Sequence, residues 1–240
     1  MTPPTGARLP EPRLFVVIVA AGLGTRLGGE TRKAALALGG IPLVVRALRA
    51  FSGTPRAIGG AVVVHADDLV RAEHEWLPES EATFPWQVVV GGETRAASCQ
   101  RGIASAPTTA DLFAVHDAAR PLLSTEDRDR VLALTTESQC DGAILAAPVI
   151  DTLKEVEGDR IVGTVDRTNL WGAQTPQVFT RAALERARQW GPCEGTDEAS
   201  WLVAAGADIR VIEARSPNPK ITLPADFIAW EARLAAGPGR

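Results

Sequence analysis

The sequence predicts an α/β protein built on a doubly wound, mostly parallel β-sheet. Short apolar runs rich in β-branched residues recur along the chain, segments with helical spacing separate them, and a glycine-rich loop follows the first run. Strands that alternate with helices in this way form parallel sheets, because each crossover helix brings the chain back to start the next strand in the same direction. A chain of 240 residues is long enough for one large domain of this kind.

The predicted elements follow one another in a regular order. The predicted strands are apolar runs bounded by turn residues, and they lie at 14–20, 59–65, 86–90, 111–117, 142–149 and 207–213. The predicted helices have apolar residues at helical spacing, and they lie near 42–52, 66–76, 94–106, 124–138, 180–190, 197–204 and 224–235. The first five strands and first four helices alternate, as a parallel sheet requires.

Residues 151–172 interrupt this pattern. They are polar and alternating, with a turn at Glu157-Gly158-Asp159, and so predict a β-hairpin arm that projects from the sheet. Because an arm of this kind often packs on a partner subunit, we expect a homodimer. The Pro-rich residues 1–13 and the last residues, 236–240, are predicted to be loose tails around a single domain at 14–235.

Composition and charge exclude several classes of function. The net charge of -4 and the lack of a basic run give no reason to expect nucleic-acid binding. Three widely spaced cysteines without a C-x-x-C pair predict buried thiols rather than disulfides or a zinc site, and the three histidines lack metal-ligand spacing. The apolar stretch at 14–21 is too short to span a bilayer and leads into a glycine loop, so we expect a cytoplasmic protein that does not bind membranes.

The strongest motif is the glycine loop AAGLGTRLG at residues 20–28, directly after the first predicted strand. Glycine lets backbone N–H groups come close to a phosphate chain at this end of a parallel strand. Arg26 lies within the loop and Lys33 follows seven positions later, so two cations accompany it. Arg and Lys are usually solvated surface charges, but beside a glycine loop they are better explained as an anion site.

Two other glycine-loop families match less well. The dinucleotide fingerprint G-x-G-x-x-G fails at its sixth position, which is Leu27, and no acid follows at the spacing that would bind a ribose. The next strand also begins too late for a compact unit of this type. A P-loop is excluded because G-x-x-x-x-G-K-[ST] is absent.

Further segments extend the motif along the chain. They are GGETRAAS (91–98), HDAARP (116–121), PVIDT (148–152), TVDR (164–167), TDEAS (196–200) and NPKIT (218–222). With the glycine loop, the sequence resembles the 2-C-methyl-D-erythritol 4-phosphate cytidylyltransferases of the non-mevalonate isoprenoid pathway over roughly residues 14–230. The glycine loop is shared by many nucleotidyltransferases, whereas HDAARP with TVDR and TDEAS is highly specific.

The resemblance implies a Rossmann-like nucleotidyltransferase fold and a role for each matching residue. The implied catalytic residues are Arg26 and Lys33. The implied nucleotide-binding residues are Ala20, Ala21, Gly22, Gly24, Gly91, Gly92, Glu93, Ser98, Asp117 and Ala118. The implied acceptor-binding residues are Arg167, Lys220, Arg120, Thr152 and Thr196, with Arg167 acting across the dimer. The implied substrates are CTP and 2-C-methyl-D-erythritol 4-phosphate, and Mg²⁺ would be carried by the CTP phosphates, with Asp117 as a candidate contact.

Several of these residues have plain structural alternatives. Asp117 ends a predicted strand, where open α/β sheets bind ligands, but it could also cap the next turn or pair with Arg120. Helix capping explains Glu93 and Thr94 about as well as function does, and it is the stronger explanation for Thr196. Arg167, at the end of the arm, could form a surface salt bridge.

The implied reaction needs charge neutralisation more than proton transfer. The acceptor phosphate is already an anion, so it can attack the α-phosphorus of CTP without a general base. Arg26 and Lys33 would offset the negative charge that develops, and Arg167 and Lys220 would align the acceptor. One departure from the family stands beside Lys33, where Arg32 replaces the usual proline and could share or compete for the phosphate role.

Three rival functions remain open at this point. A cytidylyltransferase for another polyol phosphate, such as ribitol 5-phosphate, would keep the same fold and mechanism. An NAD-dependent oxidoreductase is disfavoured by the incomplete dinucleotide fingerprint. A catalytically dead nucleotide-binding module is disfavoured because mere nucleotide binding would not require Arg167 and Lys220.

Overall fold

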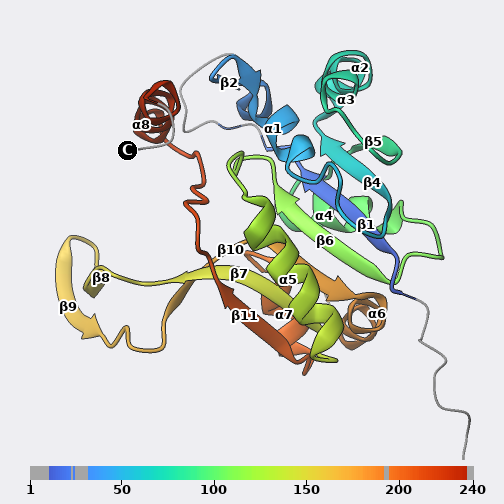
Figure 1. The fold of residues 1–240 in the computed structure, drawn as a ribbon. Helices are drawn as coiled ribbons and strands as arrows, with labels where there is room; N and C mark the ends of the chain where they lie inside the picture. The colour runs from blue at the N-terminus through green and yellow to red at the C-terminus, as the bar shows by residue number, and fades with distance from the viewer. Residues whose placement is uncertain (1–10, 23, 25–31, 192–194, 237–240) are drawn as a thin grey trace, which may run out of the picture.

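A seven-stranded β-sheet forms the centre of the computed structural model, which describes residues 11–22, 24, 32–191 and 195–236 (Figure 1). The strand order is β11-β7-β10-β6-β1-β4-β5. All neighbours pair in parallel except β10, which is antiparallel to both β6 and β7. The strands are β1 (Leu14–Val19), β4 (Ala57–Val64), β5 (Trp86–Val90), β6 (Leu112–Asp117), β7 (Gly142–Pro148), β10 (Trp171–Thr180) and β11 (Ile209–Glu213). The predicted doubly wound, mostly parallel sheet is therefore confirmed.

The central strand β1 divides the core into two layers. Because successive side chains of a strand point to opposite faces, Val16 and Ile18 enter one buried cluster while Phe15 and Val17 enter the other. This explains why β1 is apolar at nearly every position.

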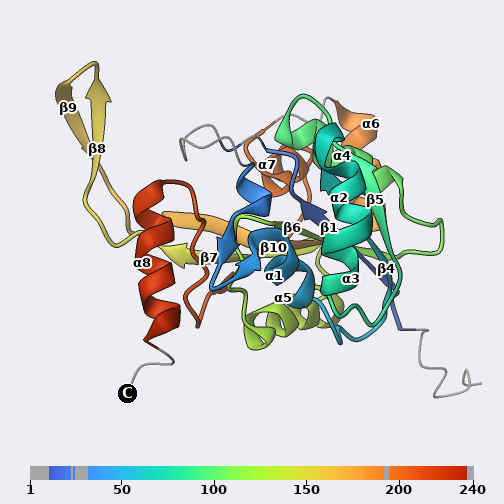
Figure 2. The same cartoon turned by 90° about the horizontal axis from the view of Figure 1, so that it is seen from above.

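Helices cover both faces of the sheet (Figure 2). Helices α1 (Leu43–Arg49) and α5 (Thr125–Glu137) supply buried residues to the first cluster. Helices α4 (Arg95–Ala104), α6 (Arg181–Trp190) and α7 (Glu198–Ala204) supply the second. The short α2 (Leu69–Arg71) and α3 (Leu77–Glu79) belong to one helical stretch over 66–79, with a π-helical turn between them.

The helices begin where polar side chains satisfy free backbone N–H groups. Thr94, Ser124, Thr180 and Asp197 each accept a hydrogen bond from a backbone N–H three residues later, at the starts of α4, α5, α6 and α7. The predicted helices are thus all present, and for α7 the cap is Asp197 rather than Thr196.

A small third cluster lies beside the main sheet. Helix α8 (Pro224–Ala235) packs Phe227 and Trp230 against the buried Leu38, Leu43 and Ile221. Leu38 belongs to a two-stranded ribbon of β2 (Ala37–Leu38) and β3 (Ile41–Pro42), which the sequence analysis did not anticipate. This cluster joins the segment after Lys33 to the segment that carries Lys220.

The predicted arm is a β-hairpin of β8 (Leu153–Glu157) and β9 (Arg160–Val165) that stands away from the body of the protein in both views (Figures 1 and 2). Gly158 takes a φ of +64° at its tip, a conformation that favours glycine. Apolar side chains on the arm are exposed, including Val156 at 51% and Ile161 at 61%.

Strand β10 was missing from the prediction, which led from the arm directly to the helix near 180–190. It lies between β6 and β7, and residues 175–179 are buried. Its pairing with β7 is interrupted between Ala173 and Gln177, where Pro176 lacks a backbone N–H to donate. Glutamines and a proline within the strand removed the continuous apolar run by which the other strands were identified.

Candidate active site

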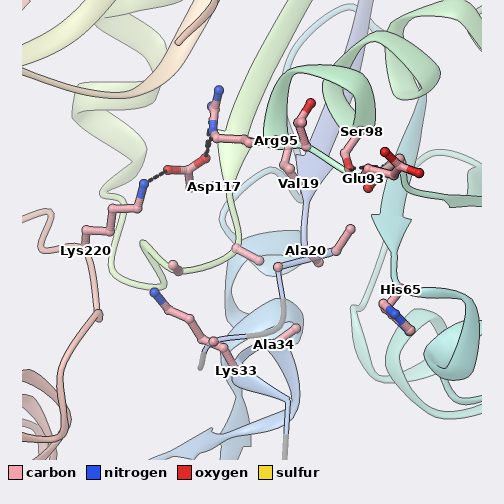
Figure 3. Close-up of a pocket in the computed structure, with 17 residues that line it drawn as sticks. Val19, Ala20, Lys33, Ala34, His65, Glu93, Arg95, Ser98, Asp117 and Lys220 are labelled. Carbon is pink, nitrogen blue, oxygen red and sulfur yellow. Dashed lines mark hydrogen bonds and ion pairs between the residues drawn. The ribbon is translucent and has the colours of Figure 1, made fainter. Parts of the chain in front are cut away.

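A cavity of about 490 Å³ lies beyond the carboxyl ends of β1, β4, β5 and β6 (Figure 3). Ligands of open α/β sheets bind at this edge. The cavity is lined by Val19, Ala20, Ala21, Gly22, Gly24, Lys33, Ala34, His65, Gly92, Glu93, Thr94, Arg95, Ser98, Asp117, Ala118, Ala119 and Lys220. Lys33 and Lys220 lie on one side, whereas Glu93, Ser98 and His65 lie on the other (Figure 3).

The cavity brings together most of the residues implied by the resemblance. Lys33, Lys220 and nine of the ten nucleotide-binding candidates line it. The tenth, Gly91, is packed just behind the lining, since a Cβ atom there would lie 2.5 Å from Ala21 Cβ and 2.8 Å from Ser98 Oγ. Arg26, the other catalytic candidate, lies outside the described residues. The functional roles of these residues remain predictions.

The glycine loop packs directly against Lys33. Gly24 has a φ of +69°, and a Cβ atom at this position would lie 2.5 Å from Lys33 Cβ. Only glycine permits both the backbone conformation and the close approach. On the opposite wall, Ser98 Oγ accepts a hydrogen bond of 3.1 Å from the Gly92 N–H, which ties the loop after β5 to the first turns of α4.

Asp117 lies between two cations at the end of β6. Its Oδ1 lies 3.0 Å from both Nε and Nη2 of Arg95, and its Oδ2 lies 2.8 Å from Lys220 Nζ. Burial alone would raise the pKa of Asp117, but the charges of Arg95 and Lys220 outweigh it and hold that pKa well below its usual range. Asp117 is therefore a carboxylate that contacts Arg95 and Lys220, and the alternative of an Asp117–Arg120 ion pair is not found.

Arg95 was not among the predicted site residues. Its guanidinium also contacts Glu198, with Nη1 at 2.9 Å from Oε1 and Nη2 at 3.1 Å from Oε2. Burial would lower the pKa of Arg95, but the two carboxylates outweigh it and raise that pKa. Arg95 could have been suspected because it follows the cap of α4 beside the predicted nucleotide loop. Nothing in the sequence joins it to Glu198, which is 103 positions away.

The other acceptor-binding candidates do not line the cavity. Arg120 donates to the carbonyl oxygens of Asn218 (2.6 Å) and Ala173 (3.3 Å), and so supports the loop that carries Lys220. Thr152, Arg167 and Thr196 are exposed, the first two at the base and end of the arm and the third just before α7. A single chain does not bring these three side chains to the pocket lining.

Arg32, the departure from the family pattern, does not line the cavity. Its Nη2 pairs with Asp67, and its Nη1 lies 3.4 Å from Asp68 Oδ1. Both aspartates belong to the turn after β4. The side chain therefore fastens the segment before Lys33 to this turn.

A buried histidine supports Asp117 from behind. The Asp117 N–H donates to Thr175 Oγ1 (3.1 Å), Thr175 Oγ1 lies 2.9 Å from His116 Nδ1, and His116 Nε2 lies 2.9 Å from the carbonyl oxygen of Arg120. Because a carbonyl oxygen only accepts, Nε2 carries the proton and Nδ1 accepts from the hydroxyl. Burial lowers the pKa of His116 to about 4, so the ring is neutral.

No group of three or more His, Cys, Asp or Glu side chains among the described residues is placed to hold a metal ion. None of the helices in the described ranges is long and apolar enough to cross a membrane.

Comparison with known proteins relates the whole fold to one family. Residues 14–236 match the family model of 2-C-methyl-D-erythritol 4-phosphate cytidylyltransferase. A protein of that name from Stenotrophomonas maltophilia (strain K279a) is 41% identical over 234 residues, which cover 94% of this chain and 98% of the relative. A bifunctional enzyme IspD/IspF from Clavibacter michiganensis subsp. michiganensis is 39% identical over 96% of this chain, which spans 55% of that longer protein.

A solved structure agrees with these sequence matches. The 2-C-methyl-D-erythritol 4-phosphate cytidylyltransferase of Thermus thermophilus superimposes with a TM-score of 0.72 at 30% identity, covering 93% of this chain and 99% of the other. On these sequence and structural matches, the chain belongs to the 2-C-methyl-D-erythritol 4-phosphate cytidylyltransferase family.

Proposed function

We propose that this protein transfers CMP from CTP to 2-C-methyl-D-erythritol 4-phosphate. An oxygen of the acceptor phosphate forms a bond to the α-phosphorus of CTP, the bond from that phosphorus to the bridging oxygen breaks, and pyrophosphate leaves. The product is 4-diphosphocytidyl-2-C-methyl-D-erythritol. The observation that carries the proposal is the cavity in which the glycine loop, Lys33 and the Asp117–Lys220 pair meet, in a chain of this family.

The division of the cavity suggests where each part of CTP binds. The wall with Ser98 and the backbone of Ala20, Ala21 and Gly92 would read the cytosine ring, because fixed N–H and C=O groups can match its edge. The side with Gly24 and Lys33 would take the triphosphate, since anions bind where backbone N–H groups and a cation converge. The volume of about 490 Å³ lies within the range of small-molecule sites.

The cations would act on the charge that develops during transfer. Lys33 offers a compact point charge to the phosphate oxygens, and Arg26 has the same role by resemblance. Lys220 would hold the acceptor phosphate in line with the α-phosphorus, and Asp117 would orient Lys220 through their ion pair of 2.8 Å. No general base is needed for this step, which agrees with a buried, neutral His116 whose two ring nitrogens bond Thr175 and the Arg120 carbonyl.

A divalent cation such as Mg²⁺ fits this site as a companion of the triphosphate. Both oxygens of Asp117 already contact Arg95 and Lys220, so the protein offers few free ligands and the phosphates would hold most of the ion. When bound, the cation would neutralise phosphate charge.

The arm is proposed to complete the acceptor site in a homodimer. Its exposed Val156 and Ile161 would be covered by a partner subunit, because apolar side chains gathered on a projecting hairpin favour association. The partner subunit's Arg167 would then contact the acceptor phosphate. We also propose a cytoplasmic location.

Pyrophosphate release tests the proposed function. Purified protein with Mg²⁺ and CTP should release pyrophosphate with 2-C-methyl-D-erythritol 4-phosphate and remain inactive without an acceptor. Lys33→Ala should lower kcat by about two to three orders of magnitude, as expected for a lost transition-state charge contact. Arg210→Ala, on the exposed edge strand β11, is the control that should keep full activity.

The assay tests the identity of the acceptor and the assignment of the catalytic cation separately. Release with ribitol 5-phosphate alone would keep the mechanism and overturn the acceptor. Activity that survives Lys33→Ala would overturn the assignment of the catalytic cation, and silence with both acceptors would favour a nucleotide-binding module.

A further inference from the structure

Glu198 and Arg95 form, with Asp117 and Lys220, a continuous chain of alternating charges. Each member contacts the next: Glu198 Oε1 lies 2.9 Å from Arg95 Nη1, Arg95 Nε lies 3.0 Å from Asp117 Oδ1, and Asp117 Oδ2 lies 2.8 Å from Lys220 Nζ. The chain crosses from helix α7, through the start of α4 and the end of β6, to the loop before α8.

All three guanidinium nitrogens of Arg95 contact the carboxylates of Asp117 and Glu198. Nε, Nη1 and Nη2 all contact Asp117 or Glu198 at 2.9–3.1 Å. The planar fork of an arginine suits such paired recognition, which a lysine could not reproduce. Although Arg95 lines the cavity, it is thus directed at carboxylates of the protein rather than at a phosphate.

Glu198 is too buried to reach a ligand. Its side chain is 1% exposed, and it does not line the cavity. It is also rigidly placed, because Gln177 of β10 donates from Nε2 to Asp197 (2.8 Å) and accepts at Oε1 from the Ala199 N–H (3.2 Å). Because Arg95 lines the cavity and Glu198 does not, we expect Glu198 to act on the site through Arg95.

The cost of burying these charges argues for a role beyond stability. Replacing a buried ion pair by apolar residues of similar volume is often neutral or stabilising, so the pair is weak evidence for a stabilising function. Here the buried end of the chain leads to Lys220, whose side chain is 42% exposed at the cavity. The ion pairs therefore connect the exposed Lys220 to the buried Glu198.

We propose that Glu198 and Arg95 are positioning residues that set the direction of Lys220 through Asp117. Glu198 neutralises Arg95 and fixes its fork, the fork holds Asp117 by Oδ1, and Oδ2 is left aimed at Lys220. Without Glu198, Arg95 is free to take both oxygens of Asp117, and Lys220 loses its orienting partner. This inference rests on the proposed function, in which Lys220 binds the acceptor phosphate.

The test is the kinetics of Glu198→Gln, which keeps the shape of the side chain and removes its charge. The KM for 2-C-methyl-D-erythritol 4-phosphate should rise about ten-fold or more, while the KM for CTP and the Kd for CTP by calorimetry change less than about two-fold. Arg95→Lys should behave in the same way, because one ammonium cannot hold two carboxylates as the fork does. Unchanged CTP binding also shows that both variants are folded.

Two matched comparisons separate positioning from general destabilisation. Asp141 is a partly buried carboxylate, 24% exposed and paired with Arg186 at 2.6 Å, but it lies just before β7, outside the cavity lining. Asp141→Asn should lower the melting temperature and leave both KM values unchanged. In a Lys220→Ala background, Glu198→Gln should have less than about two-fold further effect on acceptor use, since coupled residues are non-additive.

The results that would overturn the positioning role differ from those that would overturn the proposed function. An inactive wild-type protein would overturn the function itself. With an active wild type, an unchanged acceptor KM in Glu198→Gln, an effect matched by Asp141→Asn, or a full effect in the Lys220→Ala background would each overturn the positioning role.

Discussion

Acidification should weaken the fold through a single residue, His116. The ring is fully buried, bonds Thr175 and the Arg120 carbonyl, and contacts Phe51 edge-on. Its pKa is about 4 in the folded protein against 6.5 for an ordinary histidine. Between these two values His116 is protonated in the unfolded chain but neutral in the folded protein. The stability that is present above pH 6.5 is therefore lost as the pH falls toward 4.

The magnitude follows from this difference. Each pH unit between the two pKa values changes the free energy of unfolding by about 1.4 kcal/mol. We therefore expect a loss of about 2 kcal/mol between pH 7.5 and pH 5.0, and about 3 kcal/mol on reaching pH 4. Asp117 does not add to this window, because its pKa is lowered and its contribution is lost only at still lower pH.

Urea unfolding followed by tryptophan fluorescence measures this loss at fixed protein concentration. The pH dependence between 7.5 and 5.0 should nearly vanish in His116→Gln, which keeps a donor and an acceptor but does not titrate. It should persist in His74→Gln, because His74 is an exposed histidine away from the cavity lining. A His116→Gln variant with the wild-type pH dependence would refute the assignment.

Three further predictions concern packing, the Arg32 substitution and the arm. Gly102→Ala should lower the free energy of unfolding by about 1–3 kcal/mol in urea, because its Cβ atom would lie 2.5 Å from Val17 Cγ1 and 2.8 Å from Val63 Cγ2; unchanged stability would contradict this overpacking. Arg32→Gln should change the KM for CTP less than about three-fold, since the side chain pairs with aspartates outside the lining, whereas a rise of ten-fold or more would indicate direct phosphate binding. Ile161→Glu should shift the mass in light scattering from dimer to monomer and lower acceptor use with it; an intact dimer would exclude the arm as the interface.

The sequence was most informative where one local pattern determines the structure. Strand β1 is apolar on both faces, so its burial was predictable, and the glycine loop after it marked the edge that holds the cavity. Strand β10 was not predicted, because its glutamines and Pro176 make contacts that no local sequence pattern reveals. Gln177, for example, uses its side chain to hold the start of α7.

The residues of the candidate site were predictable where they stand in local motifs, but not where they depend on contacts between distant positions. Lys33, Asp117 and Lys220 stand in recognisable motifs and proved to share one cavity. The link from Arg95 to Glu198 joins positions 103 residues apart, which come together because α4 and α7 both contribute to the same buried cluster. Arg167 does not line the described cavity within one chain, so the role proposed for it would require a partner subunit.

The course of β10 has a consequence for how this protein can vary in length. The strand leaves the arm at Trp171 and continues into the sheet beside β6, where Thr175 bonds the backbone of Asp117. The arm is therefore connected to a core strand through residues 166–170. Residues can be added at its tip, around Gly158, without moving the interior. A single insertion between 171 and 175 would slip the strand by one position, turn its side chains to the opposite face and carry the disturbance straight to Asp117.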